Sequence, residues 1–290
     1  MQISNPDKVL FPDDAITKAD LAEYYRRIAD AMLPWLRDRP AAMIRYPDGL
    51  HGEGIMQKNV PRYFPDWIRT ADVPKQGGTV RQVICDRPAT LVYLAGQACI
   101  ELHAFLSRVG RLQQPDQLIF DLDPPADAAF GRVVTVATQL RSLLEGELAL
   151  ATFVKTTGGR GLHVHVPLNA ADDFDEARSF ALQVARTLAA RHPELATTEQ
   201  RKASRGSRVY LDVMRNAYAQ LAVTPYSVRG RPGAPVATPL SWAELDDAAL
   251  RPGQFTIATV PSRGGDPWAQ MRRRRFGLGR ARRAVARMAA

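Results

Sequence analysis

The chain has 290 residues, 46% hydrophobic and 24% charged, which is the composition of an ordinary globular protein with room for one large domain or two smaller ones. No apolar run approaches the length of a membrane-spanning helix, and the N-terminal segment does not resemble a signal peptide. Two cysteines exclude a disulfide scaffold or a cysteine-rich zinc cluster, so we expect a cytoplasmic protein with no membrane partner.

The net charge of +9 is concentrated at the C-terminus, where residues 271–290 carry eight arginines and no acid. Subtracting those eight charges from nine leaves residues 1–270 with +1. A basic tail attracts nucleic acid by releasing counterions, but the same arginines would also suit a solvated terminal helix. With no internal repeat or low-complexity linker, the sequence predicts one catalytic unit, residues 1–270, and an Arg-rich tail, residues 271–290.

Residues 5–12 predict a turn and a short extended segment, and Thr17 is placed to cap a helix that begins after it. Lys8 and Lys18 flank this turn. Both amines could meet one phosphate near the helix start, or they could be two solvated surface lysines.

Residues 40–70 alternate turn signals with short apolar pieces, which predicts strands joined by tight turns. Another turn at Gly77 precedes a strand over 80–84. Residues 90–109 have apolar positions at helical spacing and predict a helix. On this evidence alone His103 is a core or surface histidine rather than a ligand.

Residues 118–125 read Leu-Ile-Phe-Asp-Leu-Asp-Pro-Pro, an apolar strand stopped by two prolines that cannot donate to a sheet. Side chains alternate along a strand, so Asp121 and Asp123 are predicted to share one face. Two adjacent carboxylates repel each other, and a divalent cation neutralises both. The sequence therefore predicts a metal site, the alternative being an acidic strand end without a ligand.

Residues 153–167 predict a strand, a glycine-rich turn and a second strand. Three glycines let several N–H groups point at one anion. The side chains that add donors near this turn are Lys155, Thr157 and Arg160. Two alternatives are a turn that serves only chain reversal and a zinc site at His163 and His165, for which no completing ligand array is nearby. The pattern matches neither a Walker loop nor a Rossmann turn.

Three further helices are predicted over residues 132–148, 173–192 and 242–250. Asp212 lies in a strand-like run, where an acid is costly unless it is paired or bound to metal. Arg229 and Arg231 could share a strand face, an arrangement suited to bidentate phosphate contacts. Three acids, a glycine turn and downstream arginines are the groups needed for metal-assisted nucleotidyl transfer.

Three motifs in this order resemble those of the archaeo-eukaryotic primase superfamily: Phe-Asp-Leu-Asp-Pro-Pro at 120–125, Thr-Gly-Gly-Arg-Gly-Leu-His at 157–163 and Leu-Asp-x-x-Arg-Asn at 211–216. Over about residues 3–270 the sequence resembles the bacterial branch, the polymerase domain of DNA ligase D and its stand-alone relatives. The resemblance implies an α+β fold with a primase-like catalytic core. Its mixed or antiparallel sheets would form an RRM-like palm module and an N-terminal αβ module around one cleft, flanked by helices.

The resemblance also implies residue roles. The catalytic metal triad would be Asp121, Asp123 and Asp212, served by two ions of Mn²⁺ or Mg²⁺. The implied nucleotide contacts are Thr157, Arg160, His163, Arg229, Arg231, His103 and Arg205, the last also linked to assembly of the metal site. The implied pocket for a DNA 5′-phosphate is Asn5, Lys8 and Lys18, and the implied template contacts are Ile55, Met56 and Lys58.

This chain departs from its relatives at two of these places. Relatives usually carry Ser where Thr157 stands, which preserves the hydroxyl. They usually carry Phe-Phe where this chain has Ile55-Met56. Methionine packs on a base less directionally than an aromatic ring, so we expect weaker gripping of the template at this position.

The implied activity is addition of NTPs or dNTPs, with ribonucleotides preferred, to primer 3′ ends at gapped or broken DNA with a 5′-phosphate, in end joining or gap filling in the bacterial cytoplasm. A Ku-type protein and a separate DNA ligase are candidate partners, since no Lys-x-Asp-Gly ligase signature is present. One alternative is a haloacid-dehalogenase-type phosphohydrolase, although Pro-Pro follows the second Asp where that family has Thr or Val. Others are a manganese glycosyltransferase, which gives Lys8 and Lys18 no role, and a non-catalytic DNA-end-binding protein.

Overall fold

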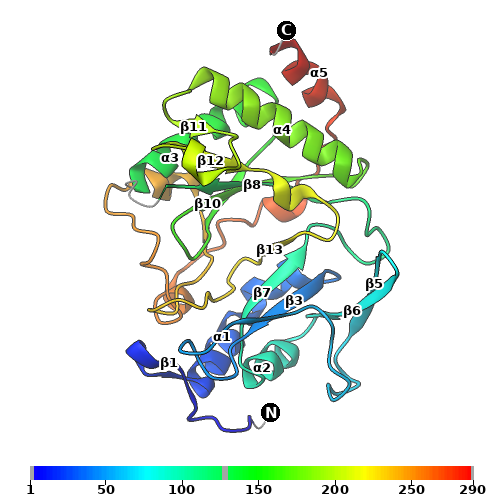
Figure 1. Cartoon of the computed structure of the whole chain (residues 1–290), viewed down its shortest axis with the longest axis vertical. Coiled ribbons are helices and arrows are strands. Elements are labelled where there is room, and N and C mark those ends of the chain that lie inside the picture. The colour runs from blue at the N-terminus through cyan, green and yellow to red at the C-terminus, as the bar shows by residue number, and fades with distance from the viewer. Residues whose placement is uncertain (1–2, 126–129, 289–290) are drawn as a thin grey trace. The chain divides into compact units, whose positions relative to one another are not determined.

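The computed structural model describes residues 3–125 and 130–288 (Figure 1). Residues 1–2 of the predicted catalytic unit, residues 126–129 and residues 289–290 of the predicted tail lie outside the described part. The chain divides into two compact units, each assembled from three separate segments. Unit 1 comprises the described parts of Met1–Leu112, Leu221–Thr238 and Gly253–Gly265, and unit 2 those of Gln113–Gln220, Pro239–Pro252 and Asp266–Ala290.

Unit 1 is built on an antiparallel sheet with the strand order β13-β7-β3-β6-β5, in which β4 also pairs with β3. These strands are β3 (Pro40–Arg45), β4 (Ile55–Gln57), β5 (Thr70–Lys75), β6 (Gly78–Ile84), β7 (Cys99–Phe105) and β13 (Leu221–Val223). A separate pair is formed by β1 (Val9–Phe11) and β2 (Ile16–Thr17). The helices are α1 (Lys18–Leu36), α2 (Pro88–Gly96) and the 3-10 turns Pro12–Asp14 and Val260–Ser262. The strands predicted between residues 40 and 84 are confirmed.

Helix α1 begins where the sequence predicts. Thr17 and Asp20 form a capping box, in which each side chain bonds to the other residue's backbone N–H. The apolar stripe of the helix is buried. Its Tyr24 hydroxyl donates to the Tyr226 carbonyl at 2.7 Å and its Tyr25 hydroxyl to the Ile100 carbonyl at 2.6 Å, so the helix is tied to β7 and to the segment after β13.

The helix predicted over 90–109 is wrong in its second half. Helix α2 ends at Gly96, Ala98 has a left-handed φ of 55°, and β7 follows, so His103 lies in a strand. β7 lies between β13 and β3 and is buried on both faces. Because both faces of β7 are buried, its apolar residues do not simply alternate with exposed polar ones, and Leu102 and Phe105 also satisfied a helical spacing.

Unit 2 is built on a sheet with the strand order β11-β12-β8-β10-β9-β14, antiparallel except for the β11/β12 pair. Its strands are β8 (Gln117–Asp123), β9 (Phe153–Thr156), β10 (Leu162–Pro167), β11 (Ala196–Thr197), β12 (Val209–Asp212) and β14 (Pro239–Leu240). Its helices are α3 (Phe130–Arg141), α4 (Phe174–Arg191) and α5 (Gly279–Met288). A π-helical turn spans Ser142–Glu147, and 3-10 turns span Lys202–Ser204, Met214–Asn216, Trp242–Asp246 and Met271–Arg273.

The predicted helices of unit 2 are found with altered ends. The helix predicted over 132–148 is α3 continued by the π-helical turn, and the one over 173–192 is α4, with a capping box of Asp173 and Glu176. Of the helix predicted over 242–250, only residues 242–246 are helical, and they form a 3-10 helix. Helices α3 and α4 pack against the sheet, and α5 packs on α4 (Figure 1).

The part of the Arg-rich segment that the structure describes is ordered on unit 2. Arg282 pairs with Asp172 and Glu176, and Val285 is buried. The expected α+β class with antiparallel and mixed sheets is confirmed. Among residues 3–125 and 130–288, no helix has both the length and the apolar character needed to cross a membrane.

Candidate active site

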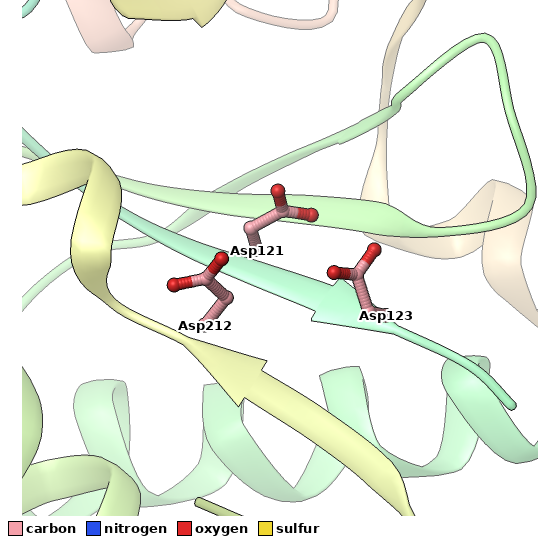
Figure 2. A group of neighbouring side chains, drawn as sticks. All are labelled: Asp121, Asp123 and Asp212. Carbon is pink, nitrogen blue, oxygen red and sulfur yellow. The ribbon is translucent and has the colours of Figure 1, made fainter. Parts of the chain in front are cut away.

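Three aspartates meet on one face of the unit 2 sheet. β12 pairs with β8 in a register that places Asp212 opposite Asp121, and Asp123 is two residues further along β8. Figure 2 shows the three carboxylates on one face of these strands, with helices behind the opposite face. Each residue offers a carboxylate oxygen, and these oxygens all lie within 4.8 Å of one another. The predicted sharing of a face by Asp121 and Asp123 is therefore found, with Leu122 buried behind them.

Crowding and burial make two of these acids, Asp123 and Asp212, hold their protons more tightly than isolated carboxyl groups do. Desolvation, followed by the charges of Asp121 and Asp212, raises the pKa of Asp123 to about 6. The pKa of Asp212 is also raised, mainly by desolvation, although a hydrogen bond from the Met214 N–H at 2.7 Å opposes the change. A site that disfavours its own charges is one that a cation would stabilise.

The glycine turn lies directly on the aspartate strand. In the β8/β10 register His163 is opposite Asp121, and its Nε2 lies 3.3 Å from the Asp121 Oδ1. A Cβ at Gly161 would overlap the Leu122 carbonyl oxygen, so only glycine permits this approach. The Thr157 hydroxyl donates to the Gly161 carbonyl and accepts from the Gly159 N–H, both at 3.2 Å, and so closes the turn. Arg160 is exposed at its tip.

Two arginines contribute positive charge to the triad. The Arg205 guanidinium lies over the Tyr210 ring, 3.8 Å from its centroid, and donates to the carbonyls of Glu199 and Gln200. Arg215 Nε lies 3.9 Å from the Asp121 Oδ2. Both charges counter the rise in the pKa of Asp123.

Sequence reasoning gave no role to Arg215, although it stands inside the third motif. Its position is fixed by the next residue, Asn216, whose side chain accepts from the Ile119 N–H at 2.8 Å and donates to the Ile119 carbonyl at 2.7 Å. The motif therefore ties the turn after β12 to β8, and the spacing of Asp212, Arg215 and Asn216 was the signal that could have identified Arg215.

A row of ionisable residues crosses the sheet. The registers place Lys155 opposite His163, His163 opposite Asp121 and Asp121 opposite Asp212. Lys155 is fully buried and donates to the Thr156 carbonyl at 3.4 Å. His165 lies two residues further along β10. Its ring centroid is 4.7 Å from that of Trp268, which favours packing rather than metal ligation.

Unit 1 contains a second polar cluster, which centres on Glu101. This buried carboxylate, 4% exposed, accepts from Arg229 Nε at 2.8 Å and the Gly230 N–H at 2.9 Å, and lies 2.9 Å from His103 Nε2. Although desolvation opposes it, these partners lower the pKa of Glu101 to about 2. Glu101 thus joins His103 and Arg229, while Arg231 stands exposed two residues on. Sequence reasoning missed Glu101, which carried no motif of its own.

Comparison with known proteins identifies the family. The model of the LigD primase-polymerase domain matches residues 17–268. The chain belongs to this family. The non-homologous end joining proteins LigD of Bacillus subtilis and Pseudomonas aeruginosa are 33% and 34% identical over 91% and 93% of the chain, which spans only 42% and 32% of their lengths. The polymerase domain of Mycobacterium tuberculosis ligase D, solved in complex with DNA, has a TM-score of 0.88 and 32% identity, covering 95% of this chain and 99% of that one.

The predicted phosphate pocket of this LigD-type chain has a third cation nearby. The Lys8 carbonyl accepts from the Lys18 N–H at 2.8 Å, and the Lys8 N–H donates to the Asn5 carbonyl at 3.2 Å, so the turn rests on the start of α1. Desolvation, then the charges of Lys8 and Arg45, lower the pKa of Lys18. The Lys8 Nζ lies 3.9 Å from the Asp48 Oδ1, which offsets one of these charges, and the remaining positive charge suits an anion. Arg45 was not identified from the sequence.

The predicted template contacts lie on and beside β4. Ile55 and Met56 are 54% and 49% exposed, and Lys58 is also exposed. In the β3/β4 register Arg45 is opposite Ile55, and its guanidinium donates to the Tyr63 hydroxyl at 3.0 Å. Tyr63, 60% exposed, is therefore an aromatic surface held beside β4.

Proposed function

We propose that this chain is a template-directed nucleotidyltransferase that extends primer 3′ ends at gaps or breaks in DNA carrying a 5′-phosphate. The observation that supports this most is the aspartate triad, brought together from β8 and β12 beside a glycine turn. Membership of the LigD primase-polymerase family and the likeness to a polymerase domain solved with DNA support the same activity.

The donor set fits divalent cations. Three carboxylate oxygens within 4.8 Å match the hard oxygen ligands that Mg²⁺ and Mn²⁺ take, and the raised pKa values of Asp123 and Asp212 show that the charged triad needs neutralising. We assign Asp121, Asp123 and Asp212 as the ligands of two ions, preferably Mn²⁺. When bound, such ions activate the primer 3′-hydroxyl and stabilise the charge of the pyrophosphate leaving group.

The other residues bind and orient the substrates. The proposed nucleotide contacts are Thr157, Arg160, His163, Arg205, His103, Arg229 and Arg231. Asn5, Lys8 and Lys18 would hold the 5′-phosphate. Ile55, Met56 and Lys58 would contact the template.

The cellular proposal follows the relatives. We assign the chain to non-homologous end joining or gap filling in bacteria, with a preference for ribonucleotides and with a Ku-type protein and a separate DNA ligase as partners. A phosphohydrolase has less support, since family membership and the glycine turn would go unexplained.

One experiment separates these functions. The protein is incubated with a 5′-phosphorylated gapped duplex, MnCl₂ and labelled NTPs, with dNTPs and MgCl₂ in parallel. Template-directed extension that is lost in Asp121→Ala and Asp123→Ala supports the polymerase. Release of phosphate from a terminal phosphomonoester without extension supports the hydrolase, and a mobility shift without extension supports a non-catalytic DNA-end-binding protein.

A further inference from the structure

Tyr46, just after β3, has its ring between two glycine backbones. A Cβ at Gly54 would lie 2.7 Å from the Tyr46 Cζ, and a Cβ at Gly230 would lie 2.7 Å from its Cε2. Real Cβ atoms do not approach other atoms this closely, so both chain segments need glycine to touch this ring. Neither glycine has a positive φ, so it is the close approach and not the backbone conformation that requires glycine.

The ring is fixed by Glu101. The Tyr46 hydroxyl hydrogen-bonds to the Glu101 carboxylate, and its pKa is raised by desolvation first and by Glu101 second. In the β3/β7 register Glu101 is opposite Ile44, two residues before Tyr46, and the Tyr46 N–H donates to the Ala98 carbonyl at 2.9 Å. Tyr46 is thus held at its hydroxyl by β7 and at its backbone by the residue just before that strand.

The two glycines lead to different predicted binding surfaces. Gly54 directly precedes the exposed Ile55 and Met56 of β4, which we assign to the template. Gly230 lies between Arg229 and Arg231, which we assign to the nucleotide. Within unit 1, therefore, one tyrosine touches both the template-side strand and the nucleotide-side loop.

We propose that Tyr46 is a positioning residue that couples template binding to nucleotide binding. The inference rests on the proposed polymerase function, because that function assigns the two surfaces. A shift of the Gly54 backbone must displace the Tyr46 ring, and a displaced ring presses on Gly230 and pulls on Glu101, which holds Arg229. Interiors packed this closely transmit small displacements. Binding at either surface therefore changes the affinity of the other surface for its ligand, and the two changes are equal.

The test introduces a methyl group on one side and measures binding on the other. Gly54→Ala, Gly230→Ala and the control Gly253→Ala, where a Cβ meets nothing within 4 Å, are each made with Tyr46 and with Tyr46→Leu. Affinity for gapped DNA is measured by fluorescence anisotropy, and nucleotide KM and kcat by primer extension with Mn²⁺ and NTP.

With Tyr46 present, Gly54→Ala should raise the nucleotide KM, and Gly230→Ala should weaken DNA binding, each by about fivefold or more, the lower end of usual coupling between sites. In the Tyr46→Leu background these cross-effects should disappear, and Gly253→Ala should have none. A cross-effect that is absent with Tyr46, or that persists in the Tyr46→Leu background, overturns the proposal.

Tyr46→Phe provides a second measurement if either alanine variant fails to fold. It keeps the ring and removes the bond to Glu101, so it should raise the nucleotide KM more than it lowers kcat, at an unchanged melting temperature; an unchanged KM contradicts the proposal. Absence of primer extension by the wild-type chain refutes the proposed function instead. The coupling is then tested by DNA anisotropy titrations with and without NTP, which need no turnover.

Discussion

The charge of Asp123 should destabilise the metal-free protein, and Asp123→Asn should relieve that cost. The folded-state pKa of about 6 exceeds the ordinary 3.8. Each pKa unit corresponds to about 1.4 kcal/mol, so the charged carboxylate would lower the free energy of unfolding by about 3 kcal/mol. Partial exposure to solvent reduces this loss of stability to about 1–2 kcal/mol. Below pH 3.8 the carboxyl is protonated in both states and costs nothing. The cost grows between pH 3.8 and about 6 and is complete above that range.

Urea denaturation in EDTA at pH 4 and pH 7 measures this effect. At pH 7 the Asn variant should be more stable than the wild type by about 1–2 kcal/mol, and at pH 4 the difference should shrink toward zero. MnCl₂ at pH 7 should stabilise the wild type and have much less effect on the variant. Asp246→Asn, at an exposed position of unit 2, is the control. An Asn variant no more stable than the wild type at pH 7, or stabilised equally by Mn²⁺, would refute the reasoning.

Gly161→Ala should lower the free energy of unfolding by on the order of 1–3 kcal/mol and weaken Mn²⁺ binding, because its methyl group would push the turn away from Leu122. The control is Gly131→Ala, whose methyl group meets no atom within 4 Å. Equal melting temperatures for the two variants would contradict this prediction. Met56→Phe should tighten binding to gapped DNA about fivefold by stacking on a base, and an unchanged anisotropy titration would show that this position does not touch the template. Arg215→Met removes a cation that favours the charged triad, so the pH of half-maximal Mn²⁺ binding should rise; a titration that does not move would place Arg215 outside the site.

Features fixed by neighbouring residues were predicted well. The pairing of Asp121 and Asp123 on one face follows from strand alternation, and Pro124 ends the strand as its missing donor requires. The start of α1 at Thr17 and the start of α4 at Asp173 follow from local hydrogen bonds between residues three apart. Such signals are contained in a few consecutive residues and need no knowledge of the rest of the fold.

Features fixed by distant residues were missed. β7 was taken as helix because β3 and β13, the strands that pair with its two edges, are far away in the sequence. Glu101 is invisible as a site residue until Arg229 and Gly230 reach it from more than 120 positions further along the chain. The division into two units from interleaved segments is likewise a property of the folded chain alone.

The difference between residues expected to touch a ligand and residues that hold them in place determines which substitutions the chain can tolerate. Residues that the motifs identify, such as Asp121 and Arg229, are those expected to touch metal or nucleotide. Residues that hold them, such as Glu101 and Asn216, have no solvent-facing role: each satisfies two or more buried polar groups, and removing one leaves its partners unpaired. The Met56 side chain is 49% exposed, so we expect a substitution there to leave the fold intact. Departures from the family pattern are therefore expected first on the template side.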